Sequence, residues 1–282
     1  MKIIDIFNDY INISKVINRQ GTVKYNVSCL AYVKKYFNSV QIETVNQFLL
    51  IKYNEFIRWF RLNTNLKNSS INKVIVFIKV VLNTNNIVLN GSFKKLKDDS
   101  NNYEPFDNNE KVLIYEALNK INNKNQNFSY KVAINLLFDT GCRISELLEI
   151  KVKNIDLKSN EILLETTKNG KNRYVFFTEK TKEVLSGLLL NCSNEYLFFN
   201  IYRRRKVLPE DIRCFFVKKL KPATGIKKIH AHRFRKTFAM DLYLKNIDLF
   251  TIMTLLGHKD LKTTQIYLSY SKEFIKRQYF LE

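Results

Sequence analysis

The sequence has little of what metal centres and disulfide frameworks are built from. Its 282 residues include three histidines and four cysteines, and the cysteines lie far apart, with neither a C-x-x-C pair nor a histidine at ligand spacing. Structural zinc sites and the disulfide frameworks of small domains usually show such close spacings. We therefore expect no metal site, and the scattered thiols are typical of a protein in a reducing compartment.

Long hydrophobic runs are also missing. No stretch approaches the roughly 18 uninterrupted apolar residues that a membrane-spanning helix requires. The first residues, MKIIDIFNDYIN, carry Asp5 and Asp9 where a signal peptide needs an apolar run. The sequence therefore predicts a cytoplasmic protein that has no membrane partner.

Positive charge, by contrast, is plentiful. The chain has 47 Lys and Arg residues against 26 Asp and Glu residues, which gives a formal net charge of +21. Both parts share the excess, with 15 basic and 6 acidic residues in 1–100 and 32 and 20 in the remainder. Two basic regions favour a polyanionic partner, with nucleic acid as the first candidate. A generally lysine-rich proteome is the other explanation, and charge alone does not separate the two.

The first hundred residues are expected to be helical. Apolar residues recur at spacings of three and four over 23–37 and 45–60, and a serine N-cap signal begins a further helical stretch over 69–84. Together with 5–17, these segments make about four helices. We assign them to a helical domain spanning 1–97.

A domain boundary follows this helical region. The stretch NGSFKKLKDDSNNYEPFD contains Gly, Ser, Asn and Pro and shows no periodicity, so we place a linker at 98–105 and a second domain at 106–282. Within the second domain, runs at 161–167 and 173–177 flank KNGKN and predict a strand–turn–strand unit. The predicted fold class is mainly α with a small antiparallel β-sheet. Further helices are expected near 180–190, 209–219, 231–245, 247–256 and 261–270.

The stretch TGCRISELLEI places an arginine at the start of a helix. Arg143 comes just after the glycine that ends the preceding helix, so its planar guanidinium is in a fixed place and can bind an anion. Glu146 lies three residues further on the same helical face and can orient it. Taken alone, the pair also fits an ordinary surface ion pair.

The stretch HAHRFRKTFAM brings a histidine and an arginine to one helical face. His232 and Arg235 are three residues apart, while Phe234 and Phe238 anchor the opposite side in the core. A buried helix that presents both groups is typical of an anion site with a proton acceptor. A basic cluster that only contacts DNA phosphates is the open alternative.

Two further stretches carry single residues of interest. Lys168 ends the first strand of the predicted hairpin, where a lysine can enter a DNA groove or remain solvated. In LLGHKDLKTTQIYLSY, Gly257 ends a helix and leaves His258 at the helix end, with Tyr267 about two turns into the next helix. Taken singly, His258 fits a capping residue and Tyr267 fits a core residue.

Together and in this order, these residues resemble the tyrosine recombinase (phage integrase) family, and the Xer-type and simple phage or transposon integrases in particular. The resemblance covers about 106–270 closely, as the family's α+β catalytic domain. It covers 1–97 more loosely, as the helical core-binding (SAM-like) domain. The sequence departs from the family at Ala231, where Pro is frequent, and at Lys236, where His is frequent. Neither position is assigned to chemistry. The residues that carry the resemblance are Arg143, Lys168, His232, Arg235, His258 and Tyr267.

The resemblance implies DNA strand exchange through a covalent protein–DNA bond, with Tyr267 as the nucleophile. It implies that Arg143 and Arg235 bind the phosphate oxygens and that His258 adds a donor. The remaining roles are a proton acceptor at His232, a general acid at Lys168 and a supporting role for Glu146. The product is a 3′-phosphotyrosyl link, which stores the bond energy, so no cofactor is expected.

The expected partners are double-stranded DNA recombination sites, a synaptic homotetramer and accessory DNA-bending proteins. Integration, excision and resolution all remain open as the outcome. A non-catalytic DNA-binding protein of the same fold, a type IB-like topoisomerase and a telomere resolvase are the alternatives. The tail 271–282 is amphipathic, and it either docks on a neighbouring protomer or folds onto its own domain.

Overall fold

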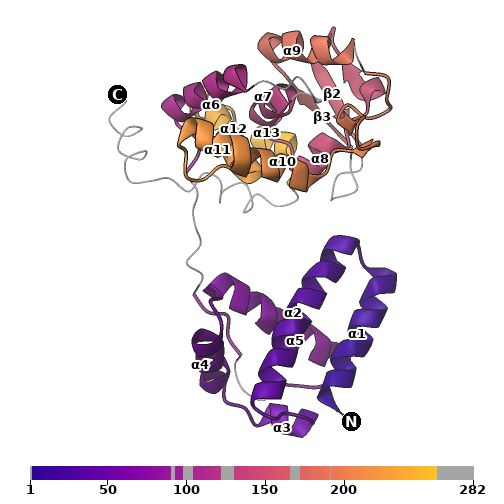
Figure 1. Ribbon diagram of the computed structural model, residues 1–282, viewed down its shortest axis with the longest axis vertical. Coiled ribbons are helices and arrows are strands. Elements are labelled where there is room, and N and C mark those ends of the chain that lie inside the picture. The colour runs from indigo at the N-terminus through magenta and orange to yellow at the C-terminus, as the bar shows by residue number, and fades with distance from the viewer. Residues whose placement is uncertain are drawn as a thin grey trace. The chain divides into compact units, whose positions relative to one another are not determined.

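The computed structural model describes residues 2–89, 93–97, 104–121, 130–165, 172–190 and 192–258. The chain forms two compact units, Met1–Asn102 and Tyr103–Glu282 (Figure 1). The described residues are mostly helical, with a small antiparallel sheet in the second unit. This confirms the predicted fold class. No described helix is long and apolar enough to cross a membrane.

Helices account for nearly all the regular structure of the N-terminal unit. In Figure 1, α1, α2 and α5 lie side by side, with α4 at the left of the unit and α3 at its lower end. Its described residues form α1 (Ile3–Ile17), α2 (Gln20–Ser39), α3 (Val45–Leu49), α4 (Tyr53–Asn63) and α5 (Asn68–Thr84).

The single helix expected over 45–60 was wrong, because the structure divides it into α3 and α4. Phe48 on α3 and Phe56 on α4 both pack against Phe93, at ring-centroid distances of 6.1 and 5.2 Å. Because the chain changes direction between the two helices, Phe48 and Phe56 can both contact the ring of Phe93. Tertiary packing therefore outweighs the helical periodicity of the segment.

Aromatic rings fill the core of the N-terminal unit. Phe7 packs edge-on against Phe37 at 5.8 Å, and Tyr36 packs edge-on against Phe56 at 5.0 Å. Phe60 is also fully buried. Such edge-to-face pairs stabilise a core beyond the burial of their area.

The described residues of the C-terminal unit form helices, a three-stranded antiparallel sheet and a two-stranded one. One sheet has the order β1-β2-β3, and in its β2–β3 register Leu164 pairs with Arg173. Lys168 lies between these strands, outside the described residues. Its elements are α6 (Asn108–Lys120), α7 (Tyr130–Thr140), α8 (Ile144–Leu148), a 3-10 turn (Val152–Asn154), β1 (Ile155–Asp156), β2 (Glu161–Leu164), β3 (Arg173–Phe176), α9 (Glu179–Leu189), β4 (Phe199–Asn200), β5 (Arg205–Lys206), α10 (Pro209–Phe215), a π-helical turn (Phe216–Leu220), α11 (Lys221–Thr224), α12 (Ala231–Leu244) and α13 (Leu249–Leu256).

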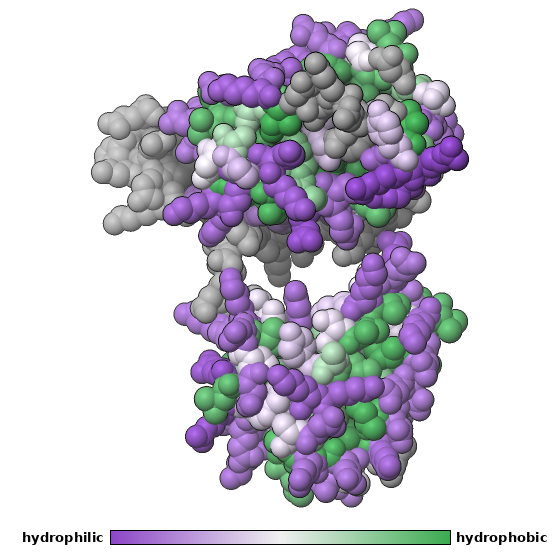
Figure 2. All heavy atoms as spheres, viewed as in Figure 1, coloured by the Kyte–Doolittle hydropathy of each residue, from purple (hydrophilic) through white to green (hydrophobic). Residues whose placement is uncertain are grey.

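Helix α7 lies at the centre of the C-terminal unit and contacts α8, α9, α12 and β3 (Figure 1). Phe138 on α7 packs edge-on against Phe234 on α12, with ring centroids 4.7 Å apart. On the next turn of α12, Phe238 joins Ile252 and Leu256 of α13 in a separate buried cluster. These contacts fix α12 between α7 and α13. Hydrophilic side chains cover much of the visible surface of the unit (Figure 2).

Candidate active site

Arg143 is placed by the end of helix α7. The helix ends at Gly141, which has a φ of +55° that favours glycine. A Cβ at Gly141 would lie 2.3 Å from the ring of Phe238, so a larger residue does not fit. Arg143 is then the N-cap residue of α8, and its side chain is 27% exposed. The sequence thus fixes this arginine between two helices with its head near the surface.

Glu146 is the partner of Arg143, as the sequence predicted from their spacing. Its carboxylate accepts a hydrogen bond from Arg143 Nη1 at 2.8 Å and another from the Arg143 backbone amide at 2.8 Å. Its side chain is only 3% exposed. Burial by itself raises the pKa of this carboxyl, but hydrogen bonds from Arg173 and Arg143 outweigh burial and lower it to about 2. Glu146 is therefore ionised at neutral pH.

Arg235 is a fully buried arginine on α12, only 1% exposed. Its Nη1 donates to the Gly141 carbonyl at 2.8 Å, and its Nη2 donates to the Leu256 carbonyl at 2.6 Å. Both carbonyls belong to helix ends, where backbone oxygens lack an intrahelical partner and carry partial negative charge. Arg235 therefore links the ends of α7 and α13, and its guanidinium plane is held in one orientation.

His258 follows α13 directly and lies beside Arg235. The helix ends at Gly257 with a φ of +66°, and the His258 ring is turned inward, leaving the residue 8% exposed. Its Nε2 is 2.7 Å from Arg235 Nη2. Because a guanidinium only donates, Nε2 accepts here, which assigns the proton of the neutral ring to Nδ1. Burial, followed by the charges of Arg235 and Arg143, lowers the pKa of His258 to about 3.

His232 lies on the first turn of α12, one turn before Arg235, and is exposed. Partial burial of the ring, then the positive charges of Arg235 and Arg143, lower the pKa of His232. The ring is therefore neutral at pH 7 and can accept a proton. The spacing of three residues places both groups on one face, as the sequence predicted.

The structure brings Arg143, Glu146, Arg235 and His258 together around the ends of α7 and α13. Lys168 and Tyr267 lie outside the described residues. Sequence reasoning missed Arg173, which donates to Glu146 from β3. The sequence shows only that Arg173 is a basic residue immediately after the KNGKN turn. No neighbouring residue indicates that it pairs with Glu146, which is 27 residues away.

No group of three or more potential metal ligands occurs among the residues that the structure describes. The cluster is instead rich in cationic donors and helix-end dipoles. Such a site suits an anion with several oxygens, and it supplies neutral imidazoles for proton transfer.

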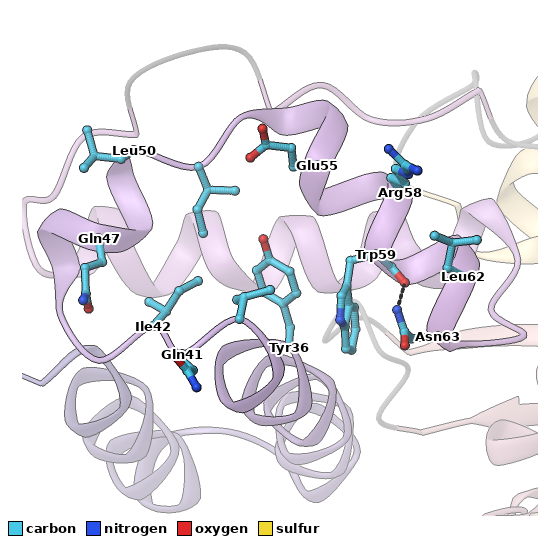
Figure 3. Close-up of a pocket in the computed structure, with 12 residues that line it drawn as sticks. Tyr36, Gln41, Ile42, Gln47, Leu50, Glu55, Arg58, Trp59, Leu62 and Asn63 are labelled. Carbon is cyan, nitrogen blue, oxygen red and sulfur yellow. Dashed lines mark hydrogen bonds between the residues drawn. The ribbon is translucent and has the colours of Figure 1, made fainter.

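A separate hollow lies on the N-terminal unit. It encloses about 480 Å³ between α2, α3 and α4 (Figure 3). Tyr36 and Trp59 line it, and Asn63 Nδ2 donates to the Trp59 carbonyl at 3.0 Å. Glu55 and Arg58 are its charged lining residues. Its lining residues include no histidine and no buried arginine, unlike the cluster around Arg235.

Comparison with known proteins decides the family. Residues 105–273 match the model of the phage integrase family, and residues 2–85 match the phage integrase SAM-like domain. The chain belongs to the phage integrase family. This confirms the resemblance inferred from the sequence, and membership makes the chain a tyrosine-type site-specific recombinase.

Relatives within the family match over much or most of their length. A probable integrase/recombinase of Acholeplasma phage L2 is 26% identical over 276 residues, covering 96% of this chain and 94% of the phage protein. The tyrosine recombinase XerA of Saccharolobus solfataricus is 37% identical over 169 residues, covering 60% of this chain and 55% of XerA.

Solved structures share the family fold. The Tn1549 transposon integrase in complex with circular intermediate DNA superposes with a TM-score of 0.78 at 15% identity, covering 99% of each chain. The XerH recombinase bound to palindromic difH gives 0.74 at 20% identity, covering 97% of this chain and 83% of XerH. Both comparisons include the helical and the mixed unit.

Proposed function

We propose that the protein cleaves and rejoins DNA at specific sites through a 3′-phosphotyrosyl intermediate, with Tyr267 as the nucleophile. The buried cluster around Arg235 carries this proposal. A fully buried arginine, a second arginine at a helix start and a neutral histidine meet there. This combination matches the charge and proton demands of attack on a phosphodiester.

The two arginines stabilise the phosphate. Attack on a phosphodiester adds negative charge to its non-bridging oxygens, so fixed donors aimed at those oxygens lower the barrier. Arg235 is fixed by the Gly141 and Leu256 carbonyls before DNA arrives. Arg143 has a partly exposed head beside it. His258 adds a neutral donor from Nδ1, because its Nε2 already accepts from Arg235.

The remaining groups move protons. A tyrosine phenol has an ordinary pKa of about 10 and must lose its proton to attack efficiently. His232 accepts that proton, because its lowered pKa keeps it neutral. The Tyr267 oxygen bonds to phosphorus, the bond to the 5′ oxygen breaks, and Lys168 protonates the leaving oxygen. Attack by a 5′ hydroxyl of the partner duplex reverses the step, so neither metal nor cofactor is consumed.

Duplex DNA is the partner of both basic regions. We assign 1–97 to core-binding, 98–105 to the linker and 106–282 to catalysis, so that two domains close around one duplex. Contacts with phosphates would dominate the affinity and make it steeply salt-dependent. Exchange between two duplexes needs four cleavages, which implies a homotetramer at synapsis. Accessory DNA-bending proteins are further proposed partners. The proposed location is the cytoplasm, where the protein would be associated with DNA.

The covalent intermediate provides the test. A duplex sequence is first enriched from a random pool with the wild-type protein. It is then nicked near the cleavage position, so that cleavage releases a short strand and traps the adduct. We expect an SDS-resistant protein–DNA adduct from the wild type and from Tyr270→Phe, and none from Tyr267→Phe. Absence of adduct with the wild type, or an undiminished adduct with Tyr267→Phe, would contradict the proposal.

A further inference from the structure

Arg173 joins three elements of the C-terminal unit. It is the first residue of β3, and its side chain is 9% exposed. Two of its guanidinium nitrogens, Nη1 and Nη2, donate to Glu146 at 3.1 and 2.7 Å. Its Nε donates to the carbonyl of Leu255 at 2.9 Å. One side chain thereby connects the hairpin strand, helix α8 and the end of helix α13.

Glu146 is saturated by this arrangement. Oε1 accepts from Arg143 Nη1 and Arg173 Nη1, and Oε2 accepts from the Arg143 amide and Arg173 Nη2. Each carboxylate oxygen thus receives two hydrogen bonds, which is about its full capacity. Arg143 therefore gives Glu146 one guanidinium hydrogen bond and does not form the two-fold pair that such residues favour.

The end of α13 is held by two arginines at successive carbonyls. Arg173 takes the carbonyl of Leu255, and Arg235 takes the carbonyl of Leu256. Gly257 follows directly, and a Cβ there would lie 2.9 Å from Arg173 Nη1. The close approach of Arg173 therefore depends on glycine at this position, immediately before His258.

We propose that Arg173 is a positioning residue that keeps Arg143 turned toward the phosphate by occupying Glu146, and that sets the helix end from which His258 projects. The inference rests on the proposed function. Without the Arg173 fork, both oxygens of Glu146 regain acceptor capacity. Arg143 then closes into a two-fold pair with Glu146, and its guanidinium turns away from the DNA.

Arg173→Lys is the test variant, because lysine keeps the positive charge but cannot donate the two parallel hydrogen bonds that the guanidinium makes to Glu146. Arg205→Lys is the matched control. Arg205 also lies on a strand and donates with Nη1 and Nη2, at 2.8 and 3.1 Å, to the carboxylate of Asp211 near a helix start. Both variants thus break a forked strand-to-helix ion pair, and only one is next to Arg143.

The first measurement is the single-turnover rate of adduct formation on saturating nicked duplex, with DNA affinity measured separately. All rates are taken below the unfolding midpoint of the least stable variant. We expect Arg173→Lys to slow cleavage about tenfold to a hundredfold, as loss of one charged hydrogen bond in the transition state would. Its DNA affinity and the rate of Arg205→Lys should stay within about threefold of wild type.

The second measurement separates positioning from general structural damage. A methylphosphonate at the cleaved position replaces one charged oxygen by a methyl group, so cleavage depends less on Arg143. The deficit of Arg173→Lys should then shrink to within about threefold of wild type on this substrate. Structural damage slows both substrates equally.

An equal deficit on both substrates, or a wild-type rate for Arg173→Lys, would overturn the inference. So would a loss that follows DNA affinity alone. The proposed function is judged separately, because it requires only that wild-type protein forms the adduct through Tyr267.

Discussion

The two units of the chain bury different kinds of side chain. Among the described residues of the N-terminal unit, the buried polar groups are the uncharged Ser14, Asn26 and Asn72. The C-terminal unit also buries Glu146 and Arg235 with other charged groups, next to His258. Buried charge costs free energy unless it is paired and hydrogen-bonded. The N-terminal core therefore relies on apolar and neutral polar contacts, whereas the C-terminal unit holds its buried charges in hydrogen bonds and ion pairs that also fix their positions for an anion.

Asn26 and Arg235 show this difference at the level of single contacts. Asn26 donates to the Ser14 hydroxyl at 2.9 Å, a neutral pair that satisfies two polar groups. Arg235 instead donates to carbonyls of two helices 94 and 21 residues away in sequence. The first contact stabilises a pair of helices, and the second builds a fixed cation.

Removal of an aromatic ring from the N-terminal core should give the largest effect, and it should fall on stability. Phe56 is fully buried and packs on Phe60 at 4.8 Å. Phe56→Ala should lower the free energy of unfolding by about 3–5 kcal/mol, because it leaves a cavity. Urea denaturation of the full chain, followed by circular dichroism, measures this. Phe250→Ala, at a residue 69% exposed, is the control and should change little.

Substitution of the buried Arg235 should instead lower mainly the rate of DNA cleavage. Arg235→Lys keeps the charge but cannot reach the carbonyls of Gly141 and Leu256 together. We expect the single-turnover cleavage rate to fall about 100- to 1000-fold, as for loss of a transition-state donor. Arg213→Lys, at an exposed arginine on α10, should leave the rate unchanged. Equal cleavage rates for the two variants would contradict the view that the buried charge of the C-terminal unit serves catalysis.

The smallest effect should appear in the pH dependence of stability. Glu146 has a folded pKa of about 2, lowered from 4.5. Since the folded value is the lower one, its ionised form stabilises the fold above about pH 4.5, and this is lost as the pH falls toward 2. Glu146→Gln should therefore flatten acid destabilisation in that range. Glu183→Gln, at an exposed residue of α9, should leave the curve of the parent chain unchanged.

Local patterns in the sequence predicted the parts of the site that depend on local geometry. The pairing of Arg143 with Glu146, and the shared face of His232 and Arg235, follow from three-residue spacing on helices. The contacts of Arg173 with Glu146 and of Arg235 with Gly141 span 27 and 94 residues, so spacing carries no information about them.

For the fold as well, the sequence predicted elements that depend on local spacing and missed features that depend on distant contacts or very short strands. Helical periodicity predicted α2 and α5 closely, because each buries residues at spacings of three and four. It missed the break between α3 and α4, on either side of which Phe48 and Phe56 pack against the distant Phe93. It also missed the β4–β5 hairpin, whose strands of two residues each are too short to show alternation.

The residue that becomes attached to DNA identifies the nucleophile. The adduct trapped on a nicked duplex is digested with protease and nuclease, and the nucleotide-linked peptide is sequenced by mass spectrometry. We expect a single phosphotyrosyl residue at Tyr267, joined to a 3′ end. Attachment at Tyr270, at another residue or through a 5′ phosphate would contradict it.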